Sequence, residues 1–232
     1  MDLIDGSFIE RIDRTATIAS FRFNIGEKID FIPGQHLEVI FDKERKELRH
    51  FLSFSSSLGR DYIEITKRLS DSPFSNCLRD LKRGDRVSFK GPLGNCVLDQ
   101  SYKDITFLIG GIGITPVVSI VEYIVDRDLD IRVNLLYSNR SIEEIAFKDR
   151  FDSFKKRDNI NVIYAVTDGS AKESGYYNGR IDKSLIEREV SNIKESLSYI
   201  FGPPKMVAAM RDLLLELGLS DNKIKTESFW GY

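Results

Sequence analysis

The sequence predicts two domains of different architecture: an antiparallel Greek-key β-barrel over residues 1–100 and a doubly wound, parallel α/β domain over residues 101–232. Three observations predict this. The first hundred residues contain short alternating segments separated by turns, as in small barrels. From residue 103 onward, apolar runs alternate with helical patterns, which is typical of a parallel sheet. Finally, a glycine-rich turn at residues 110–115 joins an apolar run to a helical pattern.

In the first half, the expected elements are short strands and one helix. The helix is expected at 73–81, because Ser72 is a good N-cap and Pro73 suits the first helical position. A further strand is expected to end in the serine-rich segment that follows Arg49. The other strands are expected at 15–23, 35–41, 61–66 and 86–89.

In the second half, strands are expected at 104–109, 132–138, 160–166, 197–201 and 224–228, and helices at 116–128, 142–156, 182–195 and 203–217. The carboxyl ends of parallel strands meet at one edge of the sheet, where ligands bind in this architecture. Four segments are expected at that edge, namely 110–115, 137–140, 167–168 and 202–204.

The glycine turn has the geometry of a pyrophosphate site. Gly110, Gly111 and Gly113 allow backbone to approach phosphates, and a helix start favours anions. The spacing is not G-x-G-x-x-G, because Pro116 stands where the third glycine would be. The alternative interpretation is a tight strand-to-helix connection without a ligand.

Composition excludes several classes of protein. The chain is 41% hydrophobic and 30% charged, so a packed core is expected, and its net charge of −2 gives no sign of nucleic-acid binding. No apolar run is long enough to span a membrane. The first residues lack a basic, apolar leader, so a cytoplasmic location is expected. Two cysteines and two histidines are too few for the usual metal sites, and no metal is expected.

Six segments in this order resemble motifs of the ferredoxin–NADP reductase superfamily, and the resemblance spans nearly the whole chain. They are Phe31–Gln35, Gly91–Gly94, Gly110–Pro116, Leu135–Arg140, Phe201–Met206 and Glu227–Phe229. The resemblance implies bound FAD in the barrel, NADH or NADPH in the α/β domain, and hydride transfer between them.

The flavin motif departs from the family pattern, an arginine followed two residues later by an aromatic residue and a serine. Reading from Arg49 places Phe51 at the aromatic position, but Leu52 where serine belongs. Reading back from Ser53 places Leu52 at the aromatic position and His50 at the arginine. The two readings put side chains on opposite strand faces. The second reading is favoured, with Arg49 still expected to reach the FAD phosphates.

The resemblance also implies roles for individual residues. Ser53, Glu227 and Phe229 are expected at the reacting centre: Ser53 beside flavin N5, Glu227 at the nicotinamide, and Phe229 over the flavin ring, with Trp230 and Tyr232 as further candidates. The other residues expected to bind FAD are Arg49, His50, Phe51, Leu52, Ile65, Thr66, Lys67, Ser72, Phe74 and Ser75. Those expected to bind the nicotinamide nucleotide are Gly110, Gly111, Gly113, Ile114, Thr115, Ser138, Asn139, Arg140, Thr167, Asp168, Gly202, Pro203 and Met206.

The choice between NADH and NADPH rests on the segment after the third strand. Thr167-Asp168 stands where NADPH enzymes of this family often carry Ser/Thr-Arg, and Asp168 would repel a 2′-phosphate. NADH is therefore favoured, although Arg140 and Lys172 are close enough in sequence to leave NADPH open.

The expected activity is transfer of a hydride from NAD(P)H to FAD and of electrons to a separate acceptor such as ferredoxin, flavodoxin or an oxygenase component. Two alternatives stay open: a reductase that treats free flavin as a substrate, and a regulatory module that binds nucleotide without turnover. No nucleic-acid partner and no membrane span are expected.

Overall fold

The computed structural model describes residues 3–26, 28–169 and 175–229. The chain forms two compact units, each of which is described by itself. Unit 1 comprises residues 1–98 and 115–126, and unit 2 comprises residues 99–114 and 127–232. Unit 1 therefore includes most of a helix that follows the first strand of unit 2 in sequence.

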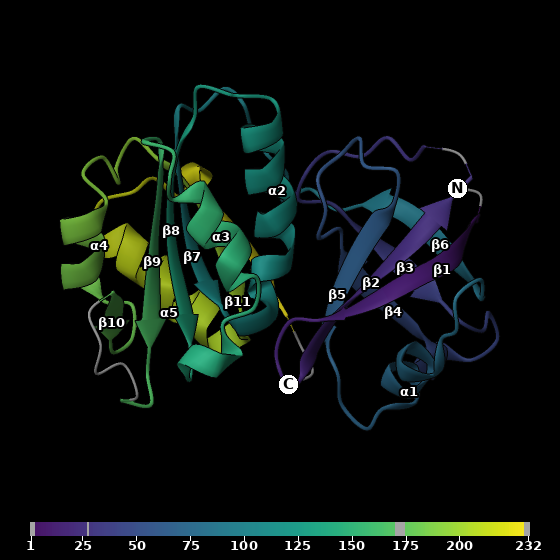
Figure 1. Ribbon diagram of the computed structural model, residues 1–232. Helices are drawn as coiled ribbons and strands as arrows, with labels where there is room; N and C mark the ends of the chain where they lie inside the picture. The colour runs from purple at the N-terminus through teal and green to yellow at the C-terminus, as the bar shows by residue number, and fades with distance from the viewer. Residues whose placement is uncertain (1–2, 27, 170–174, 230–232) are drawn as a thin grey trace. The chain divides into compact units, whose positions relative to one another are not determined.

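The described strands of unit 1 form a six-stranded antiparallel sheet in the order β4-β3-β6-β1-β2-β5. The sheet is curled, as Figure 1 shows, and α1 (Pro73–Asp80) lies at one end of it. This confirms the antiparallel barrel class as a half-barrel. The strands are β1 (Ile4–Asp13), β2 (Ile18–Ile25), β3 (His36–Ile40), β4 (Arg49–Ser53), β5 (Ile63–Arg68) and β6 (Arg86–Leu93).

Alternation along the strands turns one face of the sheet toward a common core. On β2, Phe21 and Phe23 are fully buried, whereas Arg22 between them is partly exposed. Side chains two residues apart share a sheet face, so each strand contributes one apolar face to a common core. The Phe31 and Phe54 rings stack within this core with centroids 3.9 Å apart.

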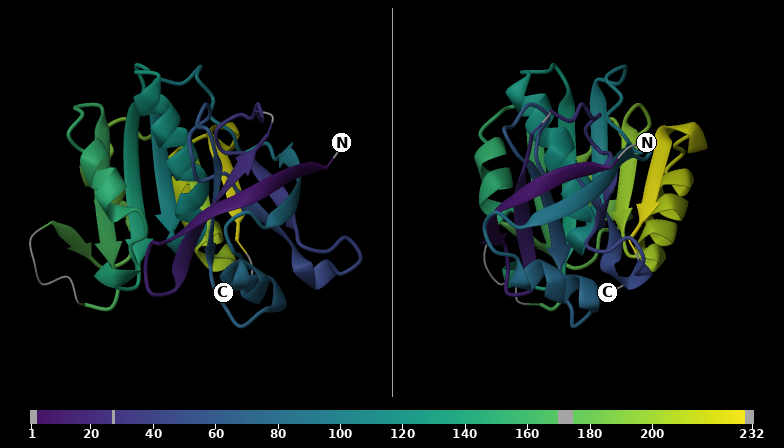
Figure 2. Two further views of the ribbon diagram at one scale, coloured as in Figure 1. Left: turned by 45° about the vertical axis from the view of Figure 1, so that its right-hand side comes forward. Right: turned by 90° about the vertical axis from the view of Figure 1, so that its right-hand side faces the viewer.

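The described strands of unit 2 form a six-stranded parallel sheet in the order β10-β9-β8-β7-β11-β12. Figure 2 shows α3 and α5 on opposite faces of it, as in a doubly wound fold. The elements are β7 (Asp104–Gly110), β8 (Arg132–Asn139), α3 (Lys148–Phe154), β9 (Ile160–Val166), β10 (Tyr176–Asn178), α4 (Lys183–Glu189), β11 (Leu197–Gly202), α5 (Pro204–Glu216) and β12 (Ile224–Ser228).

Burial on both faces explains why these strands have continuous apolar sequences. All six residues of β11 are buried, and in β7 only Asp104 is not. Parallel strands covered by helices on both sides have no solvent face that would require polar alternation.

Some elements differ from the sequence-based expectation. The helix expected at 142–156 is a short 3-10 turn, Ile142–Glu144, followed by α3, because Phe147 between them adopts a left-handed conformation with φ +60°. The helix expected at 182–195 ends at Glu189. Strands β1 and β10 were not expected.

Two further findings concern the chain as a whole. No helix in the described ranges has both the length and the apolar character needed to cross a bilayer. Cys77 and Cys96 form no disulfide, and each is partly exposed.

Candidate active site

The glycine turn of unit 2 is closely packed against the segment that follows β11. A Cβ atom on Gly113 would lie 2.5 Å from the carbonyl oxygen of Phe201, and one on Gly110 would lie 2.4 Å from the sulfur of Met206. At position 113 the close neighbour is backbone, so only glycine fits there, whereas at position 110 the Met206 side chain would have to move. Gly111 itself has φ +53°. The turn leads into α2 (Ile114–Asp126), in which Pro116 is the third residue rather than the first.

The expected strand ends do meet at one edge of the sheet. Gly110 of β7 pairs with Ser138 of β8, and Asn139 pairs with Val166 of β9. At the other side of β7, Gly202 at the end of β11 accepts a hydrogen bond from the Phe229 amide at 3.0 Å. The residues predicted for the nicotinamide nucleotide are thus gathered at the carboxyl edge of this sheet.

A pocket of about 370 Å³ opens at this edge. Four of the predicted residues line it: Ser138, Thr167, Pro203 and Met206. Sequence reasoning missed the other five, which are Arg180, Ile181, Lys205, Ala209 and Met210. Lys205 lies inside the Phe201–Met206 segment that resembles a family motif. Its place between predicted residues could have indicated that it lines the same pocket. Arg180 follows the short strand β10, which the sequence did not predict.

The buried side-chain amide of Asn139, at the same edge, makes no hydrogen bond among the described residues. Its side chain is 5% exposed, and neither its amide oxygen nor its amide nitrogen has a hydrogen-bond partner among the described residues. Leaving such groups unpaired costs about 1–3 kcal/mol each. A buried water would satisfy them, because Asn139 is not among the described residues that line the pocket.

Glu227 lies near the end of β12, paired with Phe201, and is half-buried. Burial raises the pKa of its carboxyl, which makes proton uptake easier than for an exposed glutamate. Glu227 and Phe229 belong to unit 2 and Ser53 to unit 1. Trp230, Tyr232 and Lys172 lie outside the described residues.

The predicted flavin residues of unit 1 lie on two sheet edges. β4 and β5 are the outer strands of the sheet order, and an isolated bridge between Phe54 and Ile65 joins them. Edge strands present backbone N–H and C=O groups that no neighbouring strand takes up. A planar, polar ligand placed along these edges finds donors and acceptors at Arg49–Ser53 and Ile65–Lys67.

The register of β4 separates Arg49 from His50. The Arg49 guanidinium pairs with Glu38 on the neighbouring strand at 2.8 Å, and Phe51, on the same strand face, is 58% exposed. On the opposite face, Leu52 is buried in the core and the His50 ring meets the Phe74 ring edge-on, with centroids 5.3 Å apart. The side chain that faces α1 is therefore His50.

Helix α1 begins as expected. The Ser72 hydroxyl accepts a hydrogen bond from the Ser75 amide at 3.3 Å, and Pro73 is the first helical residue. Phe74 is 2% exposed and anchors the helix start to the core. The positive end of this helix is available to an anionic group.

Lys67 provides the cation near this helix start. Burial lowers its pKa, and no acidic side chain pairs with its ammonium within the described ranges. Burial, with a smaller effect of the Lys67 charge, also lowers the pKa of His50 to about 4, so His50 is neutral at pH 7. A half-buried, unpaired ammonium fits an anionic ligand such as the FAD phosphates.

Thr66 points away from this site. Its hydroxyl lies 2.7 Å from those of both Ser20 and Ser55, on the sheet face opposite Ile65 and Lys67. Beside it, the Glu64 carboxylate is fully buried and pairs with Arg14 at 3.0 Å and Arg22 at 2.9 Å. Thr66 can therefore serve the flavin only through its backbone, and this hydroxyl–carboxylate network stiffens the β5 edge.

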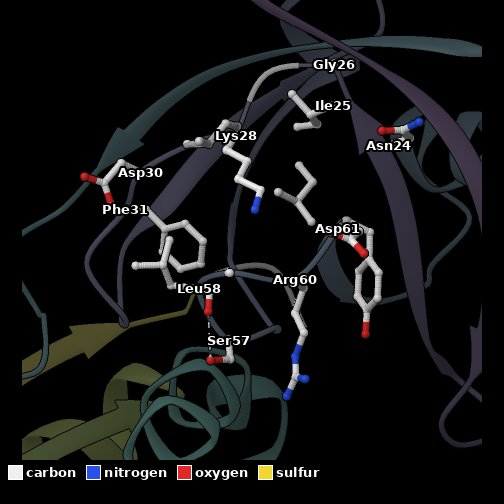
Figure 3. Close-up of a pocket in the computed structure, with 14 residues that line it drawn as sticks. Asn24, Ile25, Gly26, Lys28, Asp30, Phe31, Ser57, Leu58, Arg60 and Asp61 are labelled. Carbon is white, nitrogen blue, oxygen red and sulfur yellow. Dashed lines mark hydrogen bonds between the residues drawn. The ribbon is translucent and has the colours of Figure 1, made fainter. Parts of the chain in front are cut away.

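A larger cavity in unit 1, of about 520 Å³, lies elsewhere. Figure 3 shows the Lys28 ammonium directed into it, with Phe31, Leu58 and Arg60 along its walls. The Arg60 guanidinium donates hydrogen bonds to the Asp126 carboxylate of α2. None of the predicted flavin residues lines this cavity.

Comparison with known protein families identifies both domains. The oxidoreductase FAD-binding domain model matches residues 7–98, and the oxidoreductase NAD-binding domain model matches residues 107–212. The chain is 31% identical to the plasma membrane-associated coenzyme Q6 reductase PGA3 of Saccharomyces cerevisiae, over 90% of this chain and 69% of that protein. It is 27% identical to a glycine betaine monooxygenase reductase subunit of Pseudomonas aeruginosa, over 95% of this chain and 63% of that protein.

Other matches show the fold and the extent of the likeness. A ferredoxin NADP⁺ reductase from Neisseria gonorrhoeae, solved with FAD and NADP, superposes with a TM-score of 0.85 at 20% identity, over 99% of this chain and all of that chain. The chain also matches flavohemoproteins, including that of Bacillus subtilis at 26% identity over 86% of this chain. It spans only 52% of that protein's length.

Proposed function

The chain belongs to the ferredoxin–NADP reductase superfamily of FAD- and NAD-binding oxidoreductases, and from that membership we propose that it draws hydride from NAD(P)H and delivers electrons to a separate acceptor. The observation that carries the proposal is the presence, in one chain, of an FAD-binding domain and an NAD-binding domain. FAD, when bound, accepts a hydride from the reduced nicotinamide and releases the two electrons singly.

The protein's own residues bind and orient the two cofactors. The close-packed turn at Gly110–Gly113 brings backbone to the nucleotide pyrophosphate. Lys67 and the start of α1 hold the FAD phosphates, and the neutral His50 side chain lies beside them. The backbone edges of β4 and β5 bind the polar rim of the flavin ring.

Three residues are proposed at the reacting centre. Ser53, 4% exposed at the end of β4, offers a hydrogen bond beside flavin N5. Phe229 would pack against the flavin and give way to the nicotinamide. Glu227, whose carboxyl has a raised pKa, orients the nicotinamide amide or holds a proton beside it.

The proposed partner is a small electron-carrier protein or an oxygenase component. The likeness to a monooxygenase reductase subunit supports this choice. The 232 residues contain only two cysteines, so an iron–sulfur centre that accepts these electrons is not held by this sequence alone. A cytoplasmic location remains a prediction, which cell fractionation tests.

A second candidate is a reductase of free flavin. It is favoured by one observation: Arg49, the arginine of the flavin motif, is paired with Glu38 and faces away from α1. If FAD is retained weakly, flavin would bind and dissociate in each catalytic cycle, as a substrate does.

One absorbance experiment separates the candidates. The purified chain is desalted, its spectrum is recorded, and NADH or NADPH is added without oxygen. A flavin spectrum that bleaches on addition of nucleotide supports the proposal. A colourless protein that oxidises nucleotide only with added flavin supports the free-flavin reductase. Nucleotide binding without oxidation, even with added FAD, contradicts both and leaves a regulatory module.

A further inference from the structure

The pocket at the carboxyl edge of unit 2 suits the adenosine end of a nucleotide. Its volume of about 370 Å³ is within the usual range for ligand pockets. Ile181, Pro203 and Met206 provide apolar surface for a purine, and Ser138 and Thr167 provide hydroxyls at the strand ends. The pocket therefore combines an apolar wall with polar groups that fix orientation.

The charged side chains among the described residues of this pocket are both positive. Arg180 reaches it from the segment before α4, and Lys205 from the first turn of α5, and none of the described residues that line it is acidic. Neither head group has an ion pair with any residue that the structure describes. Two cations that line one pocket, with no carboxylate among its described lining residues, favour an anionic ligand group.

The anion in this pocket is distinct from the pyrophosphate. The pyrophosphate is expected at the glycine turn after β7, and no residue of that turn lines the pocket. The pocket is lined instead from the ends of β8 and β9 and from α5. A nicotinamide nucleotide that carries a second anionic group, separate from its pyrophosphate, is NADPH with its 2′-phosphate.

Asp168, which favoured NADH in the sequence, does not line the pocket. Its backbone amide donates to the carbonyl of Arg140 at 3.0 Å. Its charge acts on Glu143, whose carboxyl pKa is lowered mainly by a hydrogen bond from Ser141 and raised in part by Asp168. The carboxylate is thus near another acidic residue and is not among the groups that would meet a ribose in the pocket.

We propose that Arg180 and Lys205 bind the 2′-phosphate of NADPH in this pocket, so that the protein uses NADPH at least as well as NADH. The inference rests on the proposed function and names its nucleotide. Thr167 and Ser138 bind the adjacent ribose, and Pro203 and Met206 pack against the adenine.

The direct test uses two adenosine probes that differ only in the 2′-phosphate: adenosine 2′,5′-bisphosphate and 5′-AMP. Calorimetric titration of the full, FAD-loaded chain should show that the bisphosphate binds about tenfold tighter or more, with an advantage that shrinks as salt is added. Arg180→Ala and Lys205→Ala should each remove most of this advantage and change 5′-AMP affinity less than threefold. Lys183→Ala, which removes an exposed cation of α4 outside the pocket, should leave both affinities unchanged.

A kinetic test follows from the same geometry. The ratio of kcat/KM for NADPH to that for NADH should be one or more in the wild type. It should fall about a hundredfold in the double variant, if each cation contributes about tenfold. Equal binding of the two probes by the wild type, or discrimination that both substitutions leave intact, overturns the inference.

The two proposals fail in different ways. Probe binding needs no turnover, so tight, Arg180-dependent binding of the bisphosphate without flavin reduction rejects the oxidoreductase function and keeps the pocket assignment. Rapid NADH oxidation with no discrimination between the probes rejects the pocket assignment and keeps the function.

Discussion

The proposed pyrophosphate turn of unit 2 is shaped by backbone, whereas the proposed phosphate end of the flavin site in unit 1 is shaped by side chains. In unit 2, Gly113 allows an approach to the backbone of Phe201 that any Cβ would block. In unit 1, the strand register decides whether Arg49 or His50 faces α1. A site shaped by backbone can be predicted from the glycines in the sequence. A site shaped by side chains depends on the strand register, which the sequence leaves open by one residue.

The largest effect is expected from Gly113→Ala. The new Cβ would lie 2.5 Å from the Phe201 carbonyl oxygen, so the turn must move. A displacement of about 1 Å is enough for an expected hundredfold loss in kcat/KM for the nucleotide. FAD retention, measured by absorbance after desalting, should be unchanged because the residues proposed to hold the FAD phosphates belong to unit 1. The matched control is Gly26→Ala, whose Cβ would meet nothing within 4 Å; equal effects of the two variants would contradict the backbone-shaped site.

The next effect concerns the network behind the flavin edge. Glu64→Gln removes the charge that Arg14 and Arg22 share at a fully buried position, and should lower the free energy of unfolding by about 2 kcal/mol. That is a factor of about thirty in the ratio of folded to unfolded protein. Urea unfolding of the FAD-free chain measures it.

Glu10→Gln is the control for this variant, because Glu10 pairs with Arg22 at the surface. Its effect should be below about 0.5 kcal/mol. If the two substitutions lower the free energy of unfolding by the same amount, the buried network does not stabilise the β5 edge.

A smaller effect should distinguish the two cations of the flavin motif. Lys67→Ala should weaken FAD binding by the apoprotein about tenfold, because it removes the unpaired ammonium near α1. Arg49→Ala should weaken it less than threefold, because Arg49 pairs with Glu38. Flavin fluorescence quenching measures both dissociation constants. A larger loss of FAD affinity in Arg49→Ala than in Lys67→Ala would show that Arg49 contacts the phosphates, as the sequence predicted.

The smallest effect is a pH dependence due to His50. Its pKa is lowered to about 4 by burial, so the unfolded chain takes up a proton near pH 6.5 and the folded chain only near pH 4. The stability due to neutral His50 is therefore full above pH 6.5 and is lost as pH falls toward 4. Partial exposure of the ring reduces the loss to about 1 kcal/mol.

His50→Gln should remove this contribution. Unfolding free energies of the FAD-free wild type and variant are compared at pH 7 and pH 4.5. His36, whose pKa burial also lowers, contributes equally to both proteins and cancels in the comparison. An identical pH dependence of the two proteins would show that His50 is not held neutral.

The same contrast explains how much the sequence could predict. Glycines and strand–helix alternation predicted the parallel sheet and the gathering of its strand ends, because both follow from local chemistry. Arg180 was missed because β10, which brings it to the pocket, has only three residues. The break at Phe147 was missed because a left-handed phenylalanine has no local signature. The partner of Arg49 lies on another strand, at Glu38, and only the register reveals it.

The two open edges of unit 1 have a consequence for the protein in the cell. Strands with unsatisfied backbone groups are templates on which other chains add and aggregate, unless something covers them. A flavin seated along β4 and β5 covers the same groups that an intruding strand would use. In that arrangement the FAD-free chain is expected to aggregate more readily than the FAD-loaded chain.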